Sequence, residues 1–81
     1  MKMFYVVEEF YTNNGNETRL VNYEIKGAFA SFAEAAAYVD DVFQNKNKRG
    51  EWKACAGCED APVHSIRKNM GDSSIRMYVK E

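Results

Sequence analysis

Cys55, Cys58 and His64 are the side chains of this 81-residue sequence whose types and spacing point most directly to chemistry. They lie in the run WKACAGCEDAPVH, residues 52–64. A Cys-x-x-Cys pair can be half of a zinc site, a redox dithiol, a short disulfide or two thiols in a turn. Structural zinc needs four ligands, and the sequence holds two cysteines and one histidine. The sequence therefore favours thiols in a turn. Zinc on Cys55, Cys58 and His64, completed by a carboxylate or a symmetric dimer, is an alternative.

A catalytic role has less support in the sequence than a structural one. The dithiol of thioredoxin-like proteins has a tryptophan directly before its first cysteine, whereas Trp52 lies three residues ahead of Cys55. The chain has no Gly-rich phosphate loop, no Ser-centred elbow and no His-x-x-x-His pair. Glu8 and Glu9 are adjacent, so in a strand they point to opposite faces and form no acid–base couple. We expect a protein that is not an enzyme and has no cofactor.

The elements that position these residues follow from apolar periodicity. Residues 3–11 and 18–26 are rich in β-branched and aromatic side chains and flank the turn sequence TNNGN, which predicts a hairpin. Residues 63–67 and 73–80 predict a second hairpin, and one extra short strand at Trp52 is compatible with this order. The expected fold class is α+β: an antiparallel sheet of about four strands with one helix on a face, in the order β-β-α-β-β, as a single domain over residues 1–81.

Residues 31–46 carry the clearest helical pattern in the sequence. Ser31 is a good N-cap, and Glu34 three positions later completes a capping box. One apolar stripe recurs at helical spacing, formed by Phe32, Ala35, Ala36, Val39, Val42 and Phe43. This stripe predicts a helix that packs across a sheet.

The first strand is apolar on both faces, which predicts a central position in the sheet. In the second strand we expect Val21, Tyr23 and Ile25 to face inward. One helix cannot cover both faces of the first strand, so its other face predicts an interface. The aromatic residues expected to dominate that interface are Tyr5, Tyr11 and Trp52.

Charge and hydropathy limit the choice of partner and location. The net charge is −1, but residues 1–45 carry a formal charge of −4 and residues 46–81 a charge of +3. No apolar run approaches the length of a membrane span, and the N-terminus lacks an export signal. We expect a soluble, cytoplasmic protein that does not bind membranes.

A nucleic-acid site is a second alternative, at the basic C-terminal hairpin. Its residues would be Arg67, Lys68, Arg76 and Lys80. The small negative net charge and the single predicted helix make this binding mode less favoured than protein binding.

In size and layout alone, the chain resembles small phage-encoded or mobile-element-encoded proteins that bind and inhibit host proteins, among them anti-CRISPR proteins. That resemblance implies a non-enzymatic binding or inhibitory module. Its partner would be another protein or a second copy of the chain.

Overall fold

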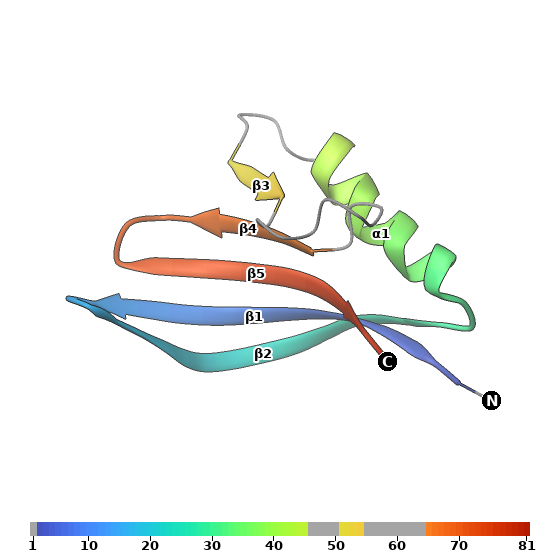
Figure 1. The fold of residues 1–81 in the computed structure, drawn as a ribbon, viewed down its shortest axis with the longest axis horizontal. Helices are drawn as coiled ribbons and strands as arrows, with labels where there is room; N and C mark the ends of the chain where they lie inside the picture. The colour runs from blue at the N-terminus through green and yellow to red at the C-terminus, as the bar shows by residue number, and fades with distance from the viewer. Residues whose placement is uncertain (1, 46–50, 55–64) are drawn as a thin grey trace.

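A computed structural model describes residues 2–45, 51–54 and 65–81 of the chain. These residues form one antiparallel sheet, in the spatial order β2-β1-β5-β4-β3, and one helix (Figure 1). The elements are β1 (Phe4–Asn14), β2 (Glu17–Phe29), α1 (Phe32–Asn45), β3 (Trp52–Ala54), β4 (Ser65–Asn69) and β5 (Ser73–Lys80). The α+β class and the antiparallel sheet are confirmed. The sheet has five strands rather than about four, because Trp52–Ala54 pairs with β4 at the sheet edge.

β1 lies between β2 and β5, with antiparallel pairing on both sides. The two chain ends meet here, since Tyr5 of β1 pairs with Lys80 of β5. Both backbone edges of β1 therefore form hydrogen bonds with neighbouring strands. This confirms the central position that the apolar side chains on both faces of the strand predict. β1 therefore holds the two hairpins of the fold together.

Glycines with positive φ close both hairpins. Gly15 (φ 64°) stands at the first central position of the β1–β2 turn, where a type II′ turn needs that conformation. Gly71 (φ 92°) lies in the β4–β5 turn. Asn13 of β1 ties this second turn to the first, because its backbone N–H donates to the Asp72 carbonyl at 2.9 Å and its amide group donates to the Gly71 carbonyl at 2.8 Å.

β2 is an edge strand with two irregularities in its pairing with β1. The register shifts between Val6 and Val7 and again between Phe10 and Tyr11. Such bulges increase the twist of an edge and make it a poorer template for another strand. The expectation that Val21, Tyr23 and Ile25 face inward is wrong: all three side chains are more than half exposed. Alternation correctly predicts that Tyr23 and Ile25 lie on the same face of β2. It does not determine which face of the sheet the helix covers.

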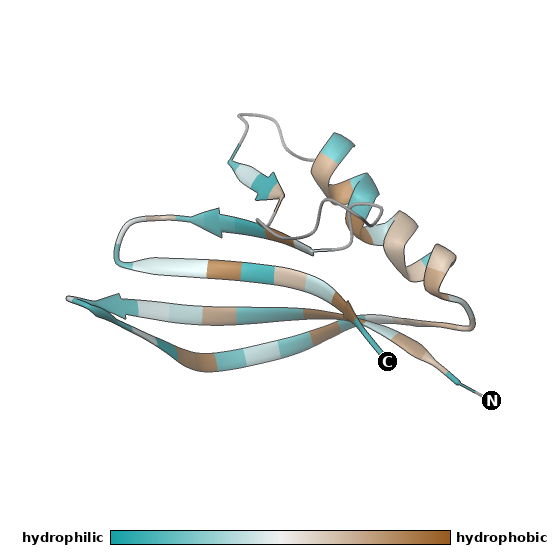
Figure 2. Cartoon of the chain, viewed as in Figure 1, coloured by the Kyte–Doolittle hydropathy of each residue, from teal (hydrophilic) through white to brown (hydrophobic). Residues whose placement is uncertain are grey.

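α1 packs across the other face of the sheet, near the end where the chain termini lie (Figure 1). The predicted N-cap at Ser31 is confirmed, because the Glu34 backbone N–H donates to Ser31 Oγ at 3.2 Å. The apolar stripe of the helix meets alternating apolar positions of the sheet, seen as brown bands along β5 in Figure 2. The resulting core consists of Val6, Ala35, Val39, Val42, Trp52, Ile66 and Met77.

Two aromatic contacts fix the position of α1. Phe4 of β1 meets Phe32 edge to face, with ring centroids 6.0 Å apart. Phe29 of β2 meets Tyr38 at 5.9 Å. These contacts tie the first two turns of the helix to the paired ends of β1 and β2. Among the described residues, no helix covers the opposite sheet face.

Candidate functional site

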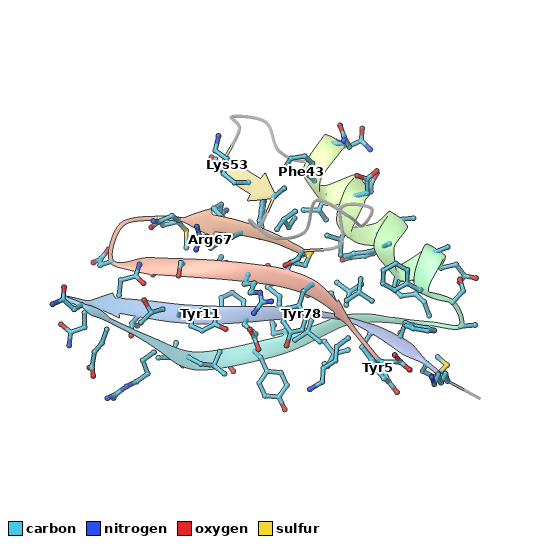
Figure 3. All side chains as sticks on the ribbon, viewed as in Figure 1. Tyr5, Tyr11, Phe43, Lys53, Arg67 and Tyr78 are labelled. Atoms are coloured by element: carbon cyan, nitrogen blue, oxygen red, sulfur yellow. The ribbon has the colours of Figure 1, made fainter. Side chains whose placement is uncertain are left out.

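The sheet face opposite α1 is the candidate functional site, and we call it the open face. Residues directly opposite each other in antiparallel strands project to the same side. Because Val6, Ile66 and Met77 are buried beneath α1, their chain neighbours project onto the open face. Those side chains include Tyr5, Val7, Glu9, Tyr11, Leu20, Tyr23, Ile25, Lys53, Arg67, Arg76, Tyr78 and Lys80. Five of them, Tyr5, Tyr11, Lys53, Arg67 and Tyr78, are labelled in Figure 3.

The β2 side of the open face is apolar and exposed. Leu20, Tyr23 and Ile25 are 47%, 61% and 54% exposed. With Val7 and Tyr78 they line a shallow hollow of about 380 Å³. Val7 forms its floor, because it is buried although it lies on the side away from α1. This hollow, the apolar hollow, is large enough for an apolar side chain of a partner.

Glu9 occupies the middle of the open face and accepts two phenolic hydrogen bonds. Tyr11 donates to Oε1 at 2.5 Å, and Tyr78 donates to Oε2 at 2.9 Å. The Arg76 guanidinium lies over the Tyr78 ring, with Cζ 4.6 Å from its centroid. Glu9 thereby holds both tyrosines in fixed orientations, which lowers the entropy that they lose when a partner covers them.

Both phenols have a raised pKa. For Tyr11 and for Tyr78 the first cause is partial burial, which disfavours the phenolate. The second cause is the hydrogen bond to the negatively charged Glu9, which favours the neutral phenol in each residue. The positive charge of Arg76 acts in the opposite direction. Both tyrosines therefore stay neutral hydrogen-bond donors at physiological pH.

The β4 side of the open face is polar and cationic. Arg67 and Arg76, directly opposite each other, line a second hollow of about 390 Å³ together with Tyr11, Asn13 and Asn69. We call it the polar hollow. Its outer wall is held by the β4–β5 turn, where the Gly71 N–H donates to Asn69 Oδ1 at 3.0 Å. The open face thus carries an apolar hollow and a cationic hollow, separated by Glu9 and its two tyrosines.

The three predicted interface aromatics divide between the two faces. Tyr5 is 37% exposed and Tyr11 is half-buried, and both lie on the open face. Trp52 is 8% exposed and belongs to the core beneath α1, where Lys68 lies 5.4 Å from its ring centroid. Its place in the core gives Trp52 a structural role, and it forms no part of the open face.

The four basic residues considered for nucleic acid are not on one surface. Arg67, Arg76 and Lys80 project onto the open face. Lys68 projects to the helix side, where its Nζ lies 3.6 Å from a carboxylate oxygen of Glu51. The basic hairpin therefore offers part of the predicted set, beside apolar and acidic side chains.

The proposed zinc ligands Cys55, Cys58 and His64 lie outside the described residues. Within residues 2–45, 51–54 and 65–81, no three His, Cys, Asp or Glu side chains are grouped as a metal site would require. Zinc on those three residues stays a prediction from the sequence.

Sequence reasoning did not identify Leu20, Ile25 or Glu9 as part of a binding surface. Alternation along β2 predicts that Tyr23 and Ile25 face inward, and the sequence around Glu9 suggests no binding role. A signal was present in the first strand, whose two apolar faces imply apolar neighbours on both sides. The one helix of residues 2–45, 51–54 and 65–81 can cover only one of those faces.

Comparison with known proteins adds no relative. No protein-family model matches the sequence, and no curated protein or solved structure matches it. In the part of the chain that the structure describes, α1 is too short and too polar to cross a bilayer.

Proposed function

We propose that this protein is a small non-enzymatic module that binds a partner protein through the open face of its sheet. The observation that carries the proposal is the exposure of Leu20, Tyr23 and Ile25 on the face opposite the core. Contiguous exposed apolar surface is unusual on a soluble monomer and marks interaction sites. Inhibition of the partner would follow from covering its surface, and it needs no catalytic group in this chain.

The mixture of side chains also supports a protein partner. Tyrosine and arginine are enriched at protein–protein interfaces and among the residues that dominate their energetics. Tyr23 lines the apolar hollow. Tyr5 and Arg76 lie beside it on the open face, each two positions along its strand from a residue that lines the hollow. The Glu9 hydrogen bonds preorganise the centre of this surface, which reduces the ordering cost of binding.

The proposal is tested by selecting ligands from a displayed library of peptides and small domains on the immobilised full chain. The Kd of the best ligand is then measured for the parent and for the triple variant Leu20→Ser, Tyr23→Ser, Ile25→Thr. We expect the triple variant to weaken binding at least about a hundredfold, because three interface contacts are lost.

Met70→Ser is the matched control, because Met70 is 47% exposed but lies in the β4–β5 turn rather than on β2. We expect this variant to bind as the parent does. Equal affinity of the parent and the triple variant, with both chains folded by circular dichroism, would contradict the proposal.

A further inference from the structure

The two hollows of the open face differ in chemistry and are neighbours on the sheet. The apolar hollow is lined by Leu20, Ile25 and Tyr78, and the polar hollow by Arg67 and Arg76. Arg76 and Tyr78 are two positions apart on β5, so one residue from each hollow projects from the same strand to the same side. A single short segment of a partner can therefore reach both hollows at once.

The cationic side of the open face holds more positive charge than its neighbours neutralise. Lys53 lies directly opposite Arg67, and Arg67 directly opposite Arg76, so three like charges stand in one row across three strands. Like charges directly opposite one another destabilise a sheet. Within the part of the chain that the structure describes, the ion pairs of Lys and Arg involve Lys2, Lys26 and Lys68, none of which is in this row.

Glu9 is the acidic side chain that stands in line with this row, opposite Arg76. Both of its carboxylate oxygens accept hydrogen bonds from phenols, from Tyr11 and from Tyr78. Glu9 therefore offsets part of the positive charge of Arg76. It does not neutralise Lys53, which lies two strands beyond Arg76 in the row. The guanidinium of Arg67 is exposed beside the polar hollow and has donors available for a carboxylate of a partner.

We propose that the open face recognises an acidic, apolar segment of a partner protein: an Asp or Glu carboxylate binds in the polar hollow, and an apolar side chain binds in the apolar hollow. This inference rests on the proposed function and specifies its partner. Arg67 and Arg76 would bind the carboxylate through charge-assisted hydrogen bonds, which arginine forms in a planar fork. Leu20, Tyr23 and Ile25 would bury the apolar side chain.

A protein carboxylate fits this surface better than a nucleic-acid backbone does. A strand of phosphates would have to pass Glu9, whose negative charge lies in the centre of the face. The chain as a whole carries a net charge of −1, which gives no long-range attraction for nucleic acid.

The test uses random peptides displayed on phage and selected on the immobilised full chain. We expect the retained peptides to be enriched in Asp or Glu placed near an aromatic or aliphatic residue. A synthetic copy of the best peptide is then titrated by fluorescence anisotropy. Arg67→Gln with Arg76→Gln should raise its Kd about tenfold or more, since charge-assisted hydrogen bonds are lost. Binding to the parent should also weaken as salt rises.

Arg19→Gln is the control for loss of an arginine, because it removes one positive charge from β2 at a position paired with Thr12, outside the row. Peptides without acidic enrichment, bound equally by parent and double variant, would overturn this inference and leave the proposed function standing. Tighter binding of a fluorescein-labelled oligo(dT) strand than of any selected peptide would also overturn it. Failure of the proposed function is a separate result: a selected peptide would then bind the Leu20, Tyr23 and Ile25 triple variant as well as it binds the parent.

Discussion

At the scale of single residues, Glu9 organises the open face. It sits on the central strand and accepts hydrogen bonds from Tyr11, two positions along β1, and from Tyr78 on β5. Partial burial and then the hydrogen bond to the carboxylate favour the neutral phenols, so the pKa of each tyrosine is raised. The cluster joins the apolar and the cationic sides of the surface in one rigid unit.

We expect Glu9→Gln to lower the pKa of Tyr11 and of Tyr78 relative to the parent, because the negative charge that opposes phenolate formation is removed. Ultraviolet titration of the phenols measures this, and Tyr11→Phe and Tyr78→Phe assign each transition. Unchanged tyrosine titration in Glu9→Gln would show that the hydrogen bonds to Glu9 are absent in solution.

The same shifts set a dependence of stability on pH. A folded-state pKa above the ordinary value of 10.0 means that the folded chain binds more protons than the unfolded chain at alkaline pH. This contribution is complete below about pH 10 and is lost as the pH rises through the folded-state pKa values. The free energy of unfolding of the parent should therefore fall with pH above 10, and more steeply than that of Glu9→Gln.

At the scale of elements, the helix and its cap were predictable from the sequence. Ser31 and Glu34 form a local signal, and the apolar stripe of residues 32–43 has a period that only a helix satisfies. The two main hairpins were predictable for the same reason, because their turn residues and their apolar alternation lie within one short stretch of sequence. The short β3 strand was uncertain because three residues carry little periodicity.

Ser31→Ala should lower the free energy of unfolding by about 0.5–2 kcal/mol, since the N–H of Glu34 loses its acceptor. Chemical denaturation followed by circular dichroism measures the change. Ser31→Asp keeps an acceptor at this position and should unfold close to the parent. If the alanine variant were as stable as the parent and as the aspartate variant, this hydrogen bond would not contribute to stability.

The faces of the strands were less predictable than their positions. Alternation along β2 groups Tyr23 with Ile25, but which sheet face they occupy depends on where α1 crosses. That crossing is fixed by contacts between segments far apart in sequence, such as Phe29 with Tyr38. The sequence therefore predicts the candidate site only in part: it identifies Tyr5, Tyr11 and the basic residues Arg67, Arg76 and Lys80, but it predicts an inward face for Tyr23 and Ile25.

At the scale of the whole molecule, one sheet serves two purposes. Its helix side holds the core, with Val6, Val39 and Ile66 fully buried. Its other side presents apolar and charged side chains at the surface, and the strand order places the cationic β3–β4 edge and the apolar β2 edge on opposite sides of β1 and β5. Because side chains on the two faces are separated by the backbone of the sheet, we expect substitutions on the open face to have little effect on the stability contributed by the core.

Two isoleucines test this division most directly, because Ile66 is 0% exposed in the core and Ile25 is 54% exposed on the open face. Each is changed to alanine, and both unfolding in urea and the affinity for a selected ligand are measured. Ile66→Ala should cost about 2–5 kcal/mol of stability. Ile25→Ala should change stability by less than about 0.5 kcal/mol yet weaken ligand binding several-fold. If Ile25→Ala instead destabilised the chain as much as Ile66→Ala and left the affinity unchanged, the open face would be part of the core and not a binding surface.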